Sequence, residues 1–187
     1  MARKPSAQAR ERILDAATGL FDRYGVHAVG MQRIIDSAAC GKNLLYSEFS
    51  SKDELVVAYL ERGRGNWTTT LDRALAAAGT PEEQLVELVR IVGDSVPGTR
   101  GCGLRNTLAE YPDQDHPVHL FVVGHLKMVR DQLRDLAART STADPDQLAD
   151  RILLIINGLY SPDRAIAAER RAATAVALAR EVVAPKP

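Results

Sequence analysis

The sequence predicts an all-α protein of nine helices with short connections. Apolar residues recur at helical spacing along nearly the whole chain, and Gly, Pro or capping residues bound each periodic segment. The alternation typical of β-strands is not found, nor is an internal repeat. We therefore expect helices from beginning to end, short ones first and longer ones after about residue 51.

The first helix is predicted to end near Tyr24. Gly25 follows, at the position where a left-handed C-terminal cap is usual. The apolar residues of this helix recur three or four positions apart and are Ile13, Leu14, Ala17, Leu20, Phe21 and Tyr24. This spacing places them on one side of the helix.

Two short helices separated by a tight turn come next. The second helix follows Gly30 as its cap, the third begins at Lys42, and residues 39–41 form the turn. Ser51 and Glu54 then make the pattern of a capping box, in which the Glu side chain reaches back to the Ser backbone. Two short helices around a Gly-containing turn are typical of helix-turn-helix DNA-binding proteins.

The residues that follow the turn resemble a known family, the TetR-type (tetracycline-repressor-like) transcriptional regulators. The family pattern Lys-x-x-Leu-Tyr-x-x-Phe-x-Ser-Lys-x-x-Leu appears here as Lys42, Leu45, Tyr46, Phe49, Ser51, Lys52 and Leu55. The resemblance in sequence covers roughly the first sixty residues, and beyond them only the helical content and the element order are similar. It implies a DNA-binding domain at residues 1–50, continuing into a helix at about 51–78, and a ligand-binding and dimerisation domain at 51–187.

The chain departs from the family pattern at three places. Ala39, Cys40 and Gly41 stand where the family has Gly, an aliphatic residue and Ser. Leu44 replaces a small polar residue, and Glu48 replaces a basic residue or His. We expect Glu48 to repel a nearby phosphate, and these departures to alter sequence preference.

The DNA contacts expected of this domain come from its second and third helices and from the start of the fourth: Gln32, Arg33, Lys42, Asn43, Leu44, Tyr46, Ser47 and Lys52. Asn43 and Leu44 are expected at base edges, because Asn pairs with adenine and an apolar side chain contacts the thymine methyl. The resemblance implies phosphate contacts by Lys42, Tyr46 and Lys52. For Gln32, Arg33 and Ser47 a solvated helix face is an equal alternative.

Charge is balanced overall but not locally. The 187 residues carry a formal net charge of zero, with 45% hydrophobic and 26% charged residues, which is typical of a soluble globular protein and excludes DNA binding by charge alone. Residues 1–12 hold Arg3, Lys4, Arg10 and Arg12 against only Glu11. We expect this basic arm to contact phosphates or a minor groove, with a solvated terminus as the alternative.

Beyond the fourth helix, Pro-containing starts and polar breaks mark five more. The predicted ranges are Pro81–Val96, Leu104–Glu110, Val118–Arg139, Pro145–Tyr160 and Pro162–Val183. The eighth helix is nearly continuously apolar and the ninth is rich in Ala. A helix that is apolar on more than one face is buried on more than one face, so we expect a homodimer through these two helices and a palindromic double-stranded operator. The alternative is that both complete the core of the monomer.

The family resemblance also implies a pocket for a small-molecule effector. Candidate lining residues on the fourth to eighth helices are Trp67, Leu71, Val92, Leu104, Leu108, Phe121, His125, Met128 and Asn157. Most are equally suited to a hydrophobic core. Trp67 and His125 are the least ordinary, since one is the single Trp and the other lies among apolar residues.

The sequence thus predicts a cytoplasmic DNA-binding transcriptional regulator, and the resemblance to the TetR family implies a repressor released from its operator by a small-molecule ligand. No cofactor, metal or membrane segment is expected, and no enzyme motif is present. One alternative is a helical interaction or ligand-sensing module that does not bind DNA. Another is a metal- or redox-responsive protein using Cys102, His116 and His119, although no further ligand occurs at zinc spacing.

Overall fold

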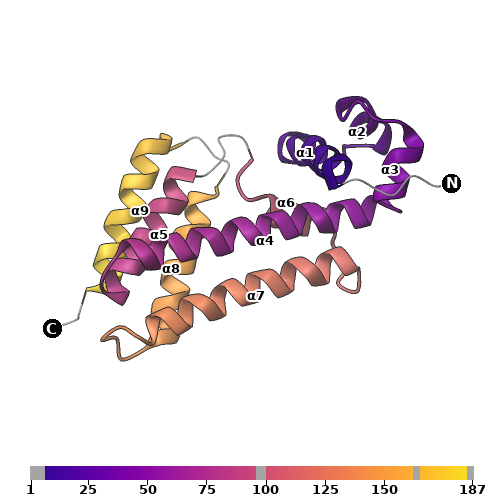
Figure 1. Ribbon diagram of the computed structural model, residues 1–187. Coiled ribbons are helices and arrows are strands. Elements are labelled where there is room, and N and C mark those ends of the chain that lie inside the picture. Colours follow the sequence, from indigo (N-terminus) through magenta and orange to yellow (C-terminus); the bar gives the residue numbers. More distant parts are fainter. Residues whose placement is uncertain (1–6, 96–99, 162–164, 185–187) are drawn as a thin grey trace. The chain divides into compact units, whose positions relative to one another are not determined.

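The computed structural model describes residues 7–95, 100–161 and 165–184. Within these ranges the chain forms nine α-helices and no strand (Figure 1), which confirms the predicted fold class. The helices are α1 (Ala7–Tyr24), α2 (Met31–Ser37), α3 (Lys42–Glu48), α4 (Lys52–Ala77), α5 (Pro81–Ser95), α6 (Gly103–Glu110), α7 (Pro117–Ala137), α8 (Pro145–Leu159) and α9 (Ala168–Val183).

The predicted helix starts agree with the structure within one residue except at α9. This helix was expected from Pro162, but it begins at Ala168. Ala167 is extended, with ψ 145°, and Ala165 and Ile166 form a bend. Residues 162–164, which carry the predicted Pro start, lie outside the described residues.

The caps of α5 and α8 are formed by the residues that directly precede Pro81 and Pro145. Thr80 Oγ1 accepts from the Glu83 N–H at 3.2 Å, and Glu83 Oε2 accepts from the Thr80 N–H at 3.0 Å. Asp144 Oδ1 accepts from the Gln147 N–H at 2.9 Å. Each cap satisfies amides that the first turn of a helix leaves without intrahelical acceptors, so these two helices start where the sequence indicates.

Two compact units make up the chain. The N-terminal unit consists of Met1–Arg64 and Gly103–Val123, and the C-terminal unit consists of Gly65–Cys102 and Gly124–Pro187. Helices α4 and α7 contribute residues to both units. The segment Gly103–Val123, which holds α6 and the start of α7, therefore belongs with the helix-turn-helix residues.

The N-terminal unit is built on the packing of α1, α2 and α3 against one another and on their link to α4. Ile13, Ile34, Leu45 and Leu55 are each fully buried, one from each of these helices. Arg62 of α4 also reaches α1, where its guanidinium binds Glu11 at 2.6 Å and Asp15 at 2.7 Å. The apolar spacing seen in the sequence thus becomes one core.

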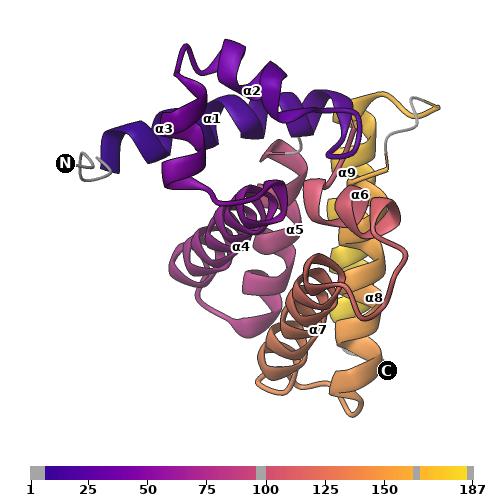
Figure 2. The same cartoon turned by 90° about the vertical axis from the view of Figure 1, so that its right-hand side faces the viewer.

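The C-terminal unit is built on α5, α8 and α9, which pack side by side (Figures 1 and 2). Its core includes Leu85, Leu88 and Ile152. A Cβ built on Gly93 of α5 would lie 3.2 Å from the Cβ of Ala172 in α9, so small residues permit close approach of these two helices. The Ala-rich sequence of α9 therefore serves, in part, the interior of the unit.

No helix among the described residues is long and apolar enough to cross a membrane.

Candidate nucleic-acid interface

The third helix presents a polar face to solvent and an apolar face to the core. Leu45 is fully buried, whereas Lys42, Asn43, Tyr46 and Ser47 are exposed. The exposed residues are one and four positions apart, so they lie on one side of the helix. The structure thus brings four of the predicted contact residues together, with half-buried Leu44 beside them.

The turn before α3 has an unusual backbone conformation. Ala39 has φ 46°, in the left-handed region that favours glycine. Gly41 has φ −79° and caps α3 without a side-chain hydrogen bond. Ala39, the residue of this turn with a positive φ, therefore stands where the family usually has Gly.

We predict that Ala39→Gly stabilises the protein. A left-handed backbone is less favourable for Ala than for Gly, which stabilises the folded variant. Gly also raises the entropy of the unfolded chain, which offsets part of this gain. The net increase in the free energy of unfolding should be about 0.5 kcal/mol. Urea denaturation measures this change. The control is Ala173→Gly, in the exposed interior of α9, which should destabilise by about 1 kcal/mol. Destabilisation by both substitutions would contradict the prediction.

The second helix contributes Gln32 and Arg33, which are exposed but already engaged. Gln32 Nε2 donates to Asp36 Oδ1 at 2.9 Å. The Arg33 guanidinium stacks on Tyr24, 3.8 Å from the ring centroid. Ser47 of α3 likewise donates to the Leu44 carbonyl at 2.8 Å. A DNA contact by any of these three side chains would compete with a contact inside the chain.

Lys52 is the first residue of α4 and is half-buried. Burial lowers the pKa of its ammonium group, while Glu110 and Asp53 act in the opposite direction. The group lies at a helix amino end, where backbone amides favour anions. Lys52 is therefore placed to bind a phosphate, although two carboxylates act on the same charge.

The capping box at the start of α4 differs from the predicted one in a single contact. Ser51 Oγ accepts from the Glu54 N–H at 3.1 Å, as expected. Glu54 Oε2 accepts from Ser50, from its N–H at 2.8 Å and from its hydroxyl at 2.7 Å, instead of from Ser51. These bonds lower the pKa of Glu54, and its carboxylate is held at the turn between α3 and α4.

Glu48 does not face outward, although the expected repulsion of a phosphate assumed that it does. Its side chain is only 7% exposed. The last turn of α3 rotates it inward beside the fully buried Phe49. The sequence shows the charge of this residue but not the helix phase that buries it.

Arg10, placed in a basic arm by the sequence, instead joins three elements. Its guanidinium stacks on Phe49, 4.1 Å from the ring centroid, and donates to the Glu48 carbonyl. It also lies 4.0 Å from a carboxylate oxygen of Glu54. Arg10 thus links α1 to the end of α3, and a phosphate contact by its guanidinium would compete with these contacts. Arg3 and Lys4 lie outside the described residues.

The residues named for metal or redox chemistry have other contacts. His116 Nδ1 accepts from the Val118 N–H at 3.2 Å, and His119 Nδ1 lies 2.7 Å from the Tyr111 carbonyl oxygen. In the part of the chain that the structure describes, no group of three or more His, Cys, Asp or Glu residues could hold a metal ion. Burial raises the pKa of the Cys40 thiol, with Arg12 acting against it.

The residues named for an effector pocket divide between the two units. Trp67, Leu71 and Val92 belong to the core of the C-terminal unit, with Met128 packed against it. In that unit His125 is buried, Asn157 is half-buried, and Trp67 Nε1 donates to Gln132 Oε1 at 2.8 Å. The N-terminal unit holds Leu104, which is buried, and Leu108 and Phe121, which are half-buried.

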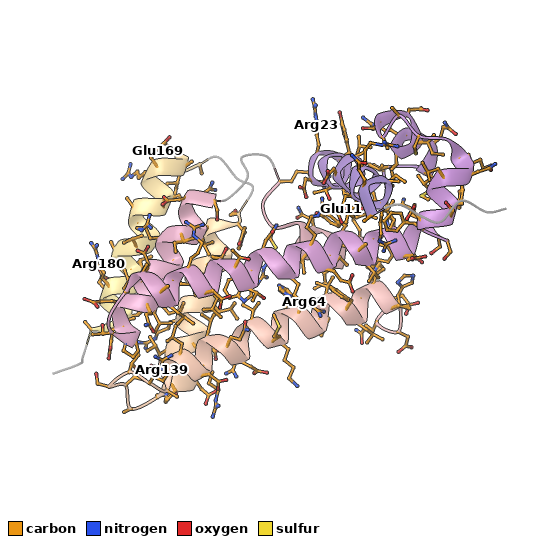
Figure 3. The ribbon with its side chains drawn as sticks, viewed as in Figure 1. Glu11, Arg23, Arg64, Arg139, Glu169 and Arg180 are labelled. Atoms are coloured by element: carbon orange, nitrogen blue, oxygen red, sulfur yellow. The ribbon has the colours of Figure 1, made fainter. Side chains whose placement is uncertain are left out.

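Phe121 also takes part in a contact that the sequence did not indicate. The Arg64 guanidinium of α4 lies 4.2 Å from the centroid of the Phe121 ring of α7, and Figure 3 shows Arg64 between these two helices. Both residues belong to the N-terminal unit. No sequence signal pairs them, because 57 positions separate an arginine and an aromatic residue that each fit many roles.

The short helices α2 and α3, the turn between them and the exposed face of α3 define the class of the amino-terminal domain, a helix-turn-helix domain. Residues 13–59 match the family model described as bacterial regulatory proteins, tetR family. A crystal structure of a TetR-family transcriptional regulator from Streptomyces coelicolor is similar over 95% of both chains, with a TM-score of 0.88 and 29% identity. The amino-terminal residues therefore match the TetR family, and the fold of the chain is similar to that of a TetR-family regulator.

Two curated relatives from Mycolicibacterium smegmatis are similar over the amino-terminal part. The transcriptional activator FasR is 35% identical over 94 residues, which are 50% of this chain and 43% of FasR. The transcriptional repressor KstR is 36% identical over 78 residues, which are 42% of this chain and 38% of KstR. The chain thus matches less than half the length of each of these relatives.

Proposed function

We propose that the protein is a transcriptional regulator that binds a palindromic double-stranded operator as a homodimer, in the cytoplasm. The observation that carries this proposal is the exposed face of α3, where Lys42, Asn43 and Tyr46 point away from a core that Leu45 anchors. A recognition helix needs such a division, because its base-reading side chains enter the major groove while its opposite face fixes it to the domain.

The contacts divide into two kinds. Asn43 and Leu44 would read base edges, whereas Lys42, Tyr46 and Lys52 would hold phosphates. Gln32, Arg33 and Ser47 would join after exchanging their contacts within the chain. A helical module that does not bind DNA was suggested by an outward Glu48 and by the zero net charge. The inward position of Glu48 weakens the first of these two observations.

The proposed dimer forms through α8 and α9. Leu154 of α8 is 69% exposed and Leu178 of α9 is 44% exposed, although Ile152, Ile156, Ala175 and Ala179 are buried inside the unit. Large exposed apolar side chains on neighbouring helices favour burial against a partner. A symmetric contact allows the two DNA-binding domains of the dimer to bind the two half-sites of one palindromic operator.

We also propose a small-molecule effector in the region of Trp67, His125 and Asn157, with residues 51–187 as the effector and dimerisation domain. The family resemblance supports this role. KstR, which is named a repressor, and FasR, which is named an activator, are similar to this chain to nearly the same extent. We propose repression, and expect a reporter gene under the operator to be more active when the regulator is deleted.

The experiment that tests the proposal is binding to the DNA upstream of the protein's own coding region at two salt concentrations. A specific complex that weakens with salt supports the regulator, because counterion release accompanies each phosphate contact. Failure to bind at low salt would overturn it. A scrambled duplex of the same composition separates specific from nonspecific binding.

Two substitutions separate the proposed kinds of contact. Lys52→Ala should weaken binding to all sequences and lower the salt slope by about one for each half-site. Asn43→Ala should cost about 1–3 kcal/mol on the operator and relax the preference at one base pair of each half-site. Fluorescence anisotropy with operator variants measures both; an unchanged base preference in Asn43→Ala would contradict its assignment.

A further inference from the structure

Three of the four histidines gather around one tyrosine in the N-terminal unit. The rings of His27 and His116 lie 4.9 Å and 4.8 Å from the Tyr111 ring, centroid to centroid. His119 Nδ1 lies 2.7 Å from the Tyr111 carbonyl oxygen. Histidine is the side chain that changes charge near neutral pH, and this cluster holds most of the histidines of the chain.

The cluster joins the DNA-binding helices to the segment between α6 and α7. Tyr111, just after α6, donates to Asp53 in the first turn of α4 at 3.2 Å. The His27 N–H, between α1 and α2, donates to Glu110 Oε2 at 2.6 Å. Burial, followed by the charge of Asp53, raises the pKa of Tyr111, so its hydroxyl remains a donor to Asp53 over the whole physiological range.

His116 has two partners, one at each ring nitrogen. Its Nδ1 accepts from the Val118 N–H at 3.2 Å and so caps α7. Its Nε2 lies 3.5 Å from Asp53 Oδ2. The neutral ring with its proton on Nε2 satisfies both partners. A second proton enters at Nδ1, which ends the cap but creates a full ion pair with Asp53.

We propose that His116 is a proton-operated switch: the neutral ring caps α7, and the protonated ring loses this cap and forms a full ion pair with Asp53 at the start of α4. Above neutral pH the imidazole caps α7. Below it the imidazolium neutralises Asp53 and holds the α6–α7 segment to the DNA-binding helices through an ion pair.

The elements beside His116 carry charged groups of both signs. Asp53 of α4, Glu110 of α6 and the exposed Asp113 and Asp115 of the connecting loop are negative, whereas Lys52 of α4 is positive. His27 and His119 are the other histidines of the cluster. Asp53, whose Oδ2 lies 3.5 Å from His116 Nε2, is the carboxylate that pairs with the imidazolium.

The switch reaches the proposed DNA contact through neighbouring residues. Lys52 precedes Asp53 in the chain, and both Asp53 and Glu110 act on its charge. When the His116 imidazolium neutralises Asp53, the start of α4 becomes less negative toward a phosphate. This consequence rests on the proposed function, whereas the switch itself does not.

The first test measures the switch without DNA. The hydrogen-exchange protection factor of the Val118 amide is measured by NMR between about pH 7.5 and about pH 5.5. We expect it to fall about tenfold in the wild type as the cap is lost, and to stay constant in His116→Asn, because Asn caps helices without titrating. The control is His119→Gln, which should keep the wild-type fall, since His119 Nδ1 can donate to the Tyr111 carbonyl in either protonation state. A constant protection factor in the wild type overturns the proposal.

The second test measures operator affinity over the same pH range. We expect the wild type to bind about two- to fivefold more tightly at the lower pH. Asp53→Asn should bind at the higher pH as the wild type does at the lower, and His116→Asn should lose most of the dependence. Equal pH dependence of operator affinity in the wild type and in His116→Asn overturns the link between the switch and DNA binding. Absence of binding at any pH overturns the proposed function. In that case the hydrogen-exchange measurement on Val118 still decides whether the switch exists.

Discussion

Replacing Leu154 and Leu178 together by Arg should leave the protein monomeric and lower its affinity for a palindromic operator by about 100-fold. Both side chains are exposed on the helices proposed to form the dimer. Burying two guanidinium groups in a symmetric apolar contact is unfavourable unless each finds a partner. Sedimentation equilibrium measures the association state, and fluorescence anisotropy measures the affinity.

The matched control for this prediction is Leu120→Arg. Leu120 lies on α7 and is 57% exposed, but it belongs to neither dimer helix. This variant should remain dimeric with full affinity. The double variant should also bind an isolated half-site with the wild-type affinity per subunit; a double variant that is still dimeric would contradict the assignment of α8 and α9.

Gly103→Ala should lower the free energy of unfolding by about 2–3 kcal/mol, because it overpacks a site with no room for a methyl group. A Cβ at Gly103 would lie at 1.9 Å from Tyr59 Oη and at 3.3 Å from Asp22 Oδ1. The Tyr59 hydroxyl donates to Asp22 at 2.6 Å, and its ring packs edge-on against Phe21. The methyl group would therefore break a hydrogen bond that joins α1 to α4. Thermal and urea denaturation measure the loss.

Gly65→Ala provides the comparison, with the opposite sign. Gly65 lies in the interior of α4, and nothing lies within 4 Å of a Cβ built on it. Alanine should therefore stabilise the helix by about 1 kcal/mol. If both substitutions had the same effect, the close approach of α6 to Tyr59 would not be the cause of the instability.

The helices were predictable from the sequence because their signals are local. Thr80, Asp144 and Ser51 act on amides within three residues, and the apolar spacing of α1 needs no knowledge of distant residues. The start of α9 was misjudged for the same reason. A Pro after Ser161 has the pattern of a helix start, but Ala165 and Ile166 continue as a bend before Ala167.

The exposed face of the candidate interface was also predictable, whereas the neighbours of its charged residues were not. Lys42, Asn43 and Tyr46 are exposed because Leu45 is buried. Helical spacing predicts this division of the side chains. Arg10 lies 38 positions before the Glu48 carbonyl that it binds. The sequence does not predict whether a charged residue near a terminus will contact a phosphate or an aromatic ring.

The contacts of Arg10 have a consequence for how α3 unfolds. Helix α3 is only seven residues long, and isolated helices of that length are unstable in water. Because Arg10 holds both the Glu48 carbonyl and the Phe49 ring, the end of α3 cannot unwind unless α1 releases it. Amides of α3 should therefore exchange with solvent at the rate of α1, as one cooperative unit, and removal of the first turn of α1 should let α3 fray by itself.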